Sequence, residues 1–424
     1  MGGVNTPSHL DFYDSEEASM TQIKGWRKVF TVLAFIGPTL IGILIFSIYP
    51  IIFNFYISFT NRNQYHPNPD CSVGLTGILE PTCWSIFREH APQGLGTPYR
   101  IASPLISNYE TLLGKLFTYP VLTGLLEILI CFLPLIIAIQ INKQFSKHES
   151  RPIPAWVLTG SGVLLGIVLW IVLNGDAAIS KIMLAGEFFT TNIHTILYVL
   201  VCIPLFYAVG LGLALLLNVP DLPGRTFFRV ILIVPWAAST VAIMMSLVWK
   251  FFFQETGTIN QVLGLFHFQK TLFLSNPIWA FVVIVIANVW YSYPFFMVTI
   301  LGALQSIPAE IYEAAEVDGA TYWQRLFTIT MPLLRPAVVP IIVLSSITTY
   351  QMFGTVWAIT GGGPSRGAGV PGATDMVMTF AYKQVFQLNA YGKMGAFAVI
   401  TFMMLFIATL YSLRISRITK GAYE

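Results

Sequence analysis

Long apolar segments with few charges recur along this chain and restrict what it can fold into. Several reach about 20 residues, the length a helix needs to cross the hydrocarbon core of a bilayer. Only 10% of the 424 residues are charged, against about 25% in a typical soluble domain. The sequence therefore predicts an all-α, polytopic transmembrane helical bundle.

About eight spans are predicted. They run approximately over Val29–Phe55, Tyr119–Ile141, Pro154–Leu173, Thr195–Leu217, Val230–Phe253, Ile278–Leu301, Ala337–Trp357 and Gly395–Leu413. The corresponding parts of the chain are a cytoplasmic tail (1–28), a first span (29–55), an extracytoplasmic loop (56–118), an accessory pair of spans with a short outer loop (119–194), a core (195–414) containing a cytoplasmic loop (303–334), and a cytoplasmic tail (415–424).

The positive charges near the spans give the orientation, because short cytoplasmic loops carry an excess of Lys and Arg. With eight spans, the flanking basic residues fall on one side. They are Lys24, Arg27 and Lys28, then Lys143, Lys147 and Arg151, then Arg225 and Arg229, and finally Arg414, Arg417 and Lys420. We expect a multi-pass protein of the cell (inner) membrane with both termini in the cytoplasm. The first span follows roughly thirty polar residues and lacks a small-residue cleavage site, which argues against a cleaved signal peptide.

Two pairs of cysteines have different expected roles. Cys71 and Cys83 share the long outer loop, on the oxidising side of the membrane, and are a candidate disulfide. Cys131 and Cys202 lie within spans, where packing is the expected role. The sequence predicts no metal site, since His66 and His90 do not have ligand spacing.

One ionisable residue, Glu127, lies deep in a predicted span. A carboxylate at that depth is costly and is a candidate functional group. The alternative is that it accepts hydrogen bonds from a neighbouring helix or another subunit. We favour the alternative, because no second acid or His continues a proton relay.

A short charged segment interrupts the apolar pattern between the sixth and seventh spans. Pro308 suits a first helical turn, and Glu310 and Glu313 then lie near the positive end of the helix dipole. Gly319 is placed to end this helix, and a second short helix is expected over 321–330, closing before Pro332. The product is a helical hairpin beneath the membrane.

The charge of this hairpin indicates what it contacts. A connector lying on lipid headgroups would present a basic face, because the inner leaflet is anionic, and a DNA-binding hairpin would also be basic. This hairpin instead carries Glu310, Glu313, Glu316 and Asp318. We therefore expect it to dock a soluble partner through Arg or Lys in that partner's cleft, and no nucleic acid is expected.

The motif spacing resembles a known family. Glu313-Ala-Ala, three residues, Gly319, nine residues and then Ile329-Thr-Met-Pro332 closely resemble the EAA loop of binding-protein-dependent ABC importer permeases, with Met331 where Leu is common. Further landmarks of the carbohydrate-uptake (MalF-type) branch are Gly224-Arg225 with Arg229, Val234-Pro235-Trp236, Gly257-Thr-Ile-Asn260, Ile307-Pro308 and Thr360-Gly-Gly-Gly-Pro364. The resemblance covers about 195–398.

The resemblance implies a type I ABC importer permease core, not an enzyme. Implied partners are a second, MalG-like permease subunit, two ATP-binding subunits, an extracytoplasmic sugar-binding protein and the lipid bilayer. ATP-Mg would bind the partner subunits, with no cofactor on this chain, which lacks a phosphate-binding loop. The implied ATPase-coupling residues are Glu310, Glu313, Ala314, Ala315, Asp318, Gly319, Ile329 and Pro332.

The resemblance also implies a sugar site midway through the membrane. The matching positions are Trp236, Thr240, Ser292, Phe295, Ser345, Thr349 and Met352. Hydroxyls and flat aromatic rings suit a sugar, and the absence of charge favours a neutral glycan. Each residue could instead pack between helices, as Ser and Thr commonly do in membranes. The glycine-rich stretch 360–364 is expected to be an outer loop whose backbone approaches something closely.

Two other classes of protein were weighed. An ion-coupled secondary transporter would show paired repeats and intramembrane ionisable residues, but Glu127 is isolated and the hairpin would have no purpose. An intramembrane enzyme would need paired Asp or metal-ligand His within spans; His194, the candidate, is expected to be structural.

Overall fold

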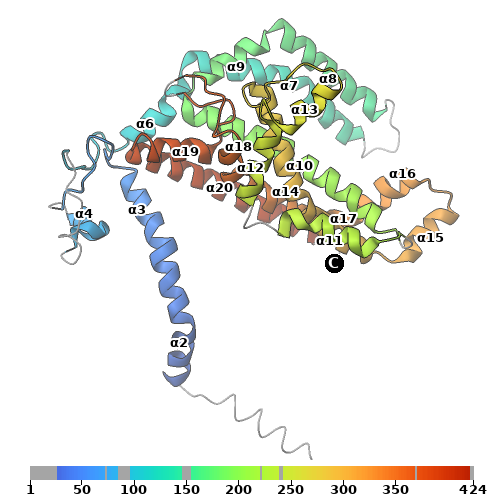
Figure 1. Cartoon of the computed structure of the whole chain (residues 1–424), viewed down its shortest axis with the longest axis horizontal. Helices are drawn as coiled ribbons and strands as arrows, with labels where there is room; N and C mark the ends of the chain where they lie inside the picture. Colours follow the sequence, from blue (N-terminus) through green and yellow to red (C-terminus); the bar gives the residue numbers. More distant parts are fainter. Residues whose placement is uncertain are drawn as a thin grey trace, which may run out of the picture. The chain divides into compact units, whose positions relative to one another are not determined.

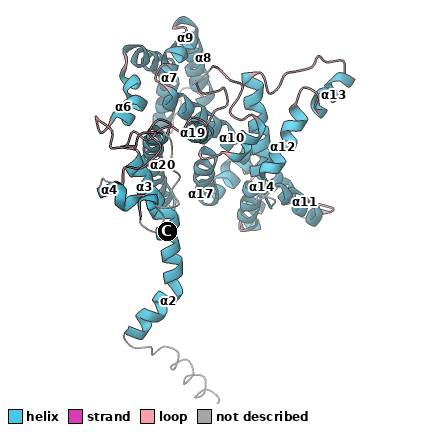
Figure 2. Cartoon of the chain, turned by 60° about the vertical axis from the view of Figure 1, so that its left-hand side comes forward, coloured by secondary structure: helices cyan, strands magenta, loops and turns pink. Residues whose placement is uncertain are grey.

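The computed structural model describes residues 26–71, 74–84, 96–145, 154–219, 222–237, 242–367 and 370–420. Helices account for most of this part of the chain (Figure 2). Within it, the only extended pairings are two isolated bridges, Thr60–Ile101 and Asn63–His66. The predicted all-α class is confirmed. The chain divides into two compact units, 1–57 with 69–92 and 58–68 with 93–424.

The first unit contains the first predicted span. Helix α2 (Trp26–Ile43), a π-helical turn (Leu44–Ile48) and α3 (Tyr49–Ile57) together give a 29-residue apolar span, Val29–Ile57. A second part of this unit contains α4 (Gly74–Leu79) and a 3₁₀ turn (Pro81–Cys83). Cys71 and Cys83 form a disulfide there, as the sequence predicts.

The second unit contains all the remaining helices. In chain order these are α6 (Ser107–Leu113), a 3₁₀ turn (Gly114–Phe117), α7 (Tyr119–Phe145), α8 (Ala155–Val172), α9 (Gly175–Met183), α10 (Glu187–Leu217), α11 (Arg225–Ala237), α12 (Ala242–Phe253), α13 (Thr258–Leu265), α14 (Pro277–Gln305), α15 (Ala309–Val317), α16 (Tyr322–Gln324), a π-helical turn (Arg325–Thr330), α17 (Met331–Tyr350), α18 (Gly354–Ile359), α19 (Val377–Phe386) and α20 (Tyr391–Lys420). Figure 1 shows their course.

Six described helices are long and apolar enough to cross a membrane, and the pair α8–α9, bent by 71°, makes up to seven. The remaining predicted span, 230–253, corresponds to α11 and α12. Residues 238–241 between these two helices lie outside the described part of the chain, so this span is not counted. The polytopic bundle expected from hydropathy is therefore present.

Two helix ends differ from the sequence prediction. Helix α10 begins at Glu187, eight residues before the predicted start, because polar side chains in its first turns bond back to its own carbonyl groups. Thr190 donates to Gly186 O, Thr191 to Glu187 O and Asn192 to Phe188 O. Hydropathy alone does not detect such satisfied polar residues. At the other end of the core, α17 ends at Tyr350 and a new helix, α18, starts at Gly354, where one span to Trp357 was predicted.

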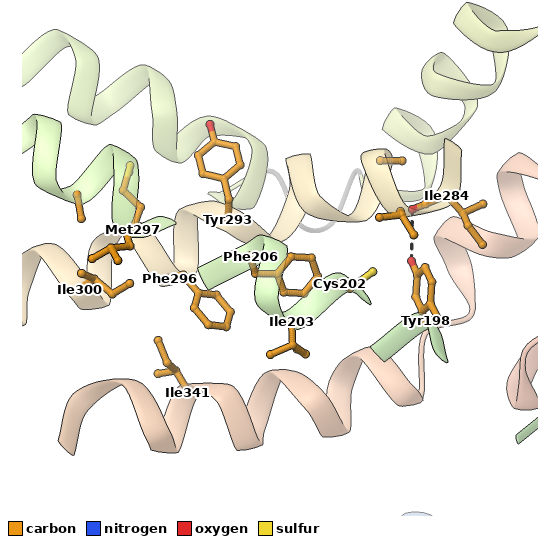
Figure 3. Packing of buried hydrophobic residues seen from close by; sticks show 14 of the residues in the cluster. Tyr198, Cys202, Ile203, Phe206, Ile284, Tyr293, Phe296, Met297, Ile300 and Ile341 are labelled. Atoms are coloured by element: carbon orange, nitrogen blue, oxygen red, sulfur yellow. Dashed lines mark hydrogen bonds between the residues drawn. The ribbon is translucent and has the colours of Figure 1, made fainter. Parts of the chain in front are cut away.

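The core of the second unit lies between α10 and α14. Its buried side chains include Tyr198, Phe206, Phe296 and Met297 (Figure 3). The Tyr198 hydroxyl donates to Ile284 O at 3.4 Å, and the rings of Phe206 and Phe296 have centroids 5.8 Å apart. Small residues at helix interfaces allow such close approach in membranes.

Gly210 provides this close approach. A Cβ atom added at Gly210 would lie 2.6 Å from the Phe296 Cβ, whereas one added at Gly212 would meet nothing within 4 Å. We expect Gly210→Ala to lower the free energy of unfolding by about 1–3 kcal/mol through overpacking. Gly212→Ala is the control on the same helix and should not destabilise. Thermal unfolding in detergent checks both, and equal midpoints for the two variants would contradict the packing.

Candidate functional site

The acidic hairpin consists of α15, a turn at Asp318–Gly319 and the following helix. Gly319 has φ +75°, a left-handed conformation that glycine adopts at little cost. Ala320 N donates to Ala315 O at 2.9 Å, which satisfies a carbonyl at the end of α15. The predicted end of the first helix is thus confirmed.

The second arm starts with a capping box. Thr321 Oγ1 accepts from Gln324 N, and the Gln324 side chain accepts from Thr321 N at 2.7 Å. The predicted end before Pro332 is wrong. The helical backbone continues through the π-helical turn into α17, and Pro332 falls in the first turn of α17. Near this proline, the Thr330 hydroxyl donates a hydrogen bond to Arg325 O at 3.2 Å.

The side chains of the hairpin divide into an outward and an inward set. Glu310, Glu313, Ala314 and Asp318 are exposed, so carboxylates and a small alanine face outward together. Ala315 is buried. Ile329 and Pro332 are half-buried.

Two contacts hold the arms of the hairpin together. Arg325 bonds Glu316 at 3.2 Å, and the hydroxyls of Tyr312 and Thr330 are 3.1 Å apart. Because Glu316 is largely exposed, this ion pair adds little stability, about 0–1 kcal/mol. Neither contact is predictable from local sequence, since both join residues on different arms.

A cavity of about 330 Å³ lies among α10, α11, α14 and α17. It brings together six of the seven predicted substrate residues: Trp236, Ser292, Phe295, Ser345, Thr349 and Met352. The seventh, Thr240, lies outside the described residues. Four residues that were not predicted from the sequence complete the lining: Phe206, Tyr291, Leu344 and Thr348.

The cavity lining combines flat rings with hydroxyls and has no charged side chain among the residues described. Trp236 and Phe295 are stacked, with centroids 5.9 Å apart and planes at 26°. Ser292 Oγ is 3.2 Å from Asn288 Oδ1, to which it donates, so its oxygen can still accept. Ser345 and Thr349 are almost fully buried. This arrangement can hold an uncharged polyhydroxyl molecule, with rings for its flat faces and hydroxyls for its edges.

Helix α14 and helix α17 connect the two features. The 29 residues of α14 carry Ser292 and Phe295 and end just before α15, while α17 starts at the hairpin and carries Ser345 and Thr349. A 20-residue helix is about 30 Å long. The hairpin and α18 therefore lie at opposite ends of α17, as Figure 1 shows.

The other residues weighed in the sequence have structural partners. Glu127 on α7 receives both hydrogen bonds from Lys181 on α9, at 2.7 and 2.9 Å, which confirms the preferred interpretation. His194 is buried, with Nδ1 3.2 Å from Asp375 O. Among the residues described, no group of three or more His, Cys, Asp or Glu could hold a metal ion.

The model of the binding-protein-dependent transport system inner membrane component family matches residues 207–418. This segment contains the hairpin and every residue of the cavity lining except Phe206. The chain belongs to this family.

Three similar relatives are permease proteins of transport systems named for trehalose/maltose, sulfoquinovosyl glycerol and maltose/maltodextrin. The trehalose/maltose transport system permease protein MalF of Thermococcus litoralis is 33% identical over 241 residues, which cover 57% of this chain and 78% of that protein. The sulfoquinovosyl glycerol permease protein SmoG of Agrobacterium fabrum is 34% identical, covering 54% and 72%. The maltose/maltodextrin permease protein MalF of Klebsiella aerogenes is 31% identical, and this chain covers 46% of its length.

Two neighbouring alanines, Ala314 and Ala315, allow a test of which face of the hairpin is buried. Ala315 is 8% exposed, so Ala315→Leu should overpack the hairpin and destabilise it by about 1–3 kcal/mol. Ala314 is exposed, and Ala314→Leu should leave the thermal midpoint and the proteolysis pattern unchanged. A destabilising Ala314→Leu with a neutral Ala315→Leu would reverse the assigned faces.

Proposed function

We propose that this chain is the transmembrane permease subunit of an ATP-binding-cassette importer that translocates a neutral sugar or oligosaccharide. The observation that carries the proposal is one helix, α14, that runs from an uncharged cavity of hydroxyls and rings to an exposed acidic hairpin. The names of two relatives, permeases for trehalose/maltose and for maltose/maltodextrin, support the substrate class.

The hairpin is proposed to dock an ATP-binding subunit. Exposed carboxylates complement Arg or Lys in a partner cleft, and a small alanine beside them permits close approach. Movement of that subunit during its ATP cycle would pull on α15, and α14 and α17 would carry the movement to the cavity they line. The coupling residues are the eight named in the sequence analysis.

The assembly proposed around this chain has five further components. They are a second, MalG-like permease subunit, two ATP-binding subunits, an extracytoplasmic sugar-binding protein and the bilayer. ATP-Mg would bind the ATP-binding subunits, and this chain would hold no cofactor. Placing the hairpin in the cytoplasm puts both termini there and puts the loop at 360–375 outside.

An ion-coupled transporter gains no support from Glu127. Its carboxylate forms an ion pair with Lys181 at 2.7 Å, so a charge-balanced contact between α7 and α9 accounts for it. Vesicle uptake that needs ATP and survives collapse of ion gradients would agree with the importer. Uptake that stops with the gradient would refute it.

Reversing one hairpin charge tests the coupling. Glu313→Lys should cut ATP-dependent sugar uptake more than tenfold, since losing a buried interface charge pair costs about 2–5 kcal/mol, while the protein still inserts and the ATP-binding subunits still hydrolyse ATP. Gly319→Pro should act similarly, because proline cannot adopt φ +75°. The control is Glu255→Lys, which reverses the charge of an exposed residue far along the chain from the hairpin. Normal uptake by Glu313→Lys would refute the proposal that the hairpin couples the ATP-binding subunit to the cavity.

Removing one hydroxyl tests the cavity. Thr349→Val keeps the side-chain volume and should raise the KM for sugar uptake about fivefold, the equivalent of one neutral hydrogen bond of about 1 kcal/mol. Thr299→Val on α14, whose hydroxyl bonds Phe295 O and does not line the cavity, is the control. A KM unchanged in Thr349→Val would remove this residue from the binding site.

A further inference from the structure

A second polar cavity, of about 380 Å³, lies at the end of the bundle away from the hairpin. The glycine-rich loop after α18 forms one wall and α19 forms the other. Its lining includes Gly362, Asp375, Lys383, Gln384 and Gln387. Its volume is similar to that of the central cavity.

Glycine is required to form the loop wall. Gly362 has φ +81°, and a Cβ atom added there would overlap the Asp375 carboxylate. Its carbonyl accepts from Thr374 N at 3.2 Å. This is the close approach expected from the Thr360-Gly-Gly-Gly-Pro364 motif, and it leaves a wall of backbone groups without side chains.

The charges at the base of this cavity cancel. Asp375 is 1% exposed, and its carboxylate accepts two hydrogen bonds from Lys383 Nζ, both at 2.9 Å, and one from Gly372 N at 2.7 Å. Pairing of this kind compensates the charge of a buried carboxylate. The cavity therefore favours an uncharged ligand over an ionic one.

Gln384 is the unusual residue of this site. It is 7% exposed, lines the cavity, and its side-chain amide makes no hydrogen bond to any residue in the described ranges. Its amide atoms are not among the side-chain atoms that are sealed from solvent without a partner, so they are open to the cavity. Gln387, the residue that caps the C-terminal end of α19, lies three residues further along the chain and also lines the cavity. Two amides, each a donor and an acceptor, match the hydroxyls of a sugar.

We propose that this cavity is a second saccharide-binding site, on the extracytoplasmic side, which holds the sugar before it enters the central cavity. The proposal rests on the proposed function. Gln384 and Gln387 bind the sugar hydroxyls, and the glycine wall lets the ligand approach the backbone. The Asp375–Lys383 pair shapes the base without adding net charge.

Equilibrium dialysis on the complete importer, without binding protein or nucleotide, tests the proposal. The probes are radiolabelled trehalose, maltose and maltotriose, with the complex in lipid nanodiscs. The wild-type complex should bind two molecules of a transported sugar. The double variant Gln384→Met/Gln387→Met should bind the second about tenfold more weakly, since it loses several hydrogen bonds. One bound molecule in the wild type, or two equally bound in the variant, would overturn the proposal.

Two controls separate binding from folding. The Gln384→Met variant should keep its thermal midpoint, because no protein hydrogen bond is lost; a lower midpoint would show that the amide has a structural role and would overturn the assignment. Gln261→Met, whose amide donates to Thr256 O at 3.0 Å, should keep both sites. Failure of all three sugars in ATP-dependent vesicle uptake would refute the proposed function itself, whereas uptake with single-site binding would refute only the second site.

Discussion

The packing of α10 against α14 is the contact on which the rest of the second unit depends. Gly210 lets the helices approach, and the buried aromatic side chains Tyr198, Phe206 and Phe296 fill the space along them. Because interiors packed in this way are stiff, α14 can act as one body from the cavity to the hairpin. Helix α14 thus carries part of the lining of the central cavity and leads directly to the acidic hairpin.

Polar contacts join the helix ends at the end of the bundle opposite the hairpin. Tyr350 at the end of α17 donates to Asn192 on α10, and Val377 N donates to Thr195 Oγ1 at 3.0 Å. Lys393 and Glu187 form an ion pair at 2.5 Å. Unpaired polar groups are costly in a bilayer. Pairing them fixes the helix ends in place beside the glycine-rich loop. The second cavity lies at this end of the bundle.

Local sequence patterns predicted much of this architecture. The apolar runs gave six of the spans, since hydropathy depends only on neighbouring residues. The end of α15 was predictable because a glycine just past a helix readily adopts the left-handed conformation that ends it. The continuation of the second arm through Pro332 was not predictable. A π-helical turn accommodates the proline, and the extra residue in that turn leaves no clear pattern in the sequence. The early start of α10 was missed because its polar side chains are satisfied within the helix.

The sequence by itself determined that the chain crosses a membrane repeatedly and that an acidic hairpin interrupts the spans, and its family resemblance named seven candidate residues for a sugar site. Tertiary structure alone decided that six of these seven residues converge on one cavity, that Glu127 pairs with Lys181, and that the Gln384 side chain lines a second cavity without a hydrogen-bond partner among the described residues. The physical reason is distance along the chain. Periodicity, caps and turns are set by residues a few positions apart, whereas the Glu127–Lys181 pair joins positions 54 residues apart and exists only once the helices pack.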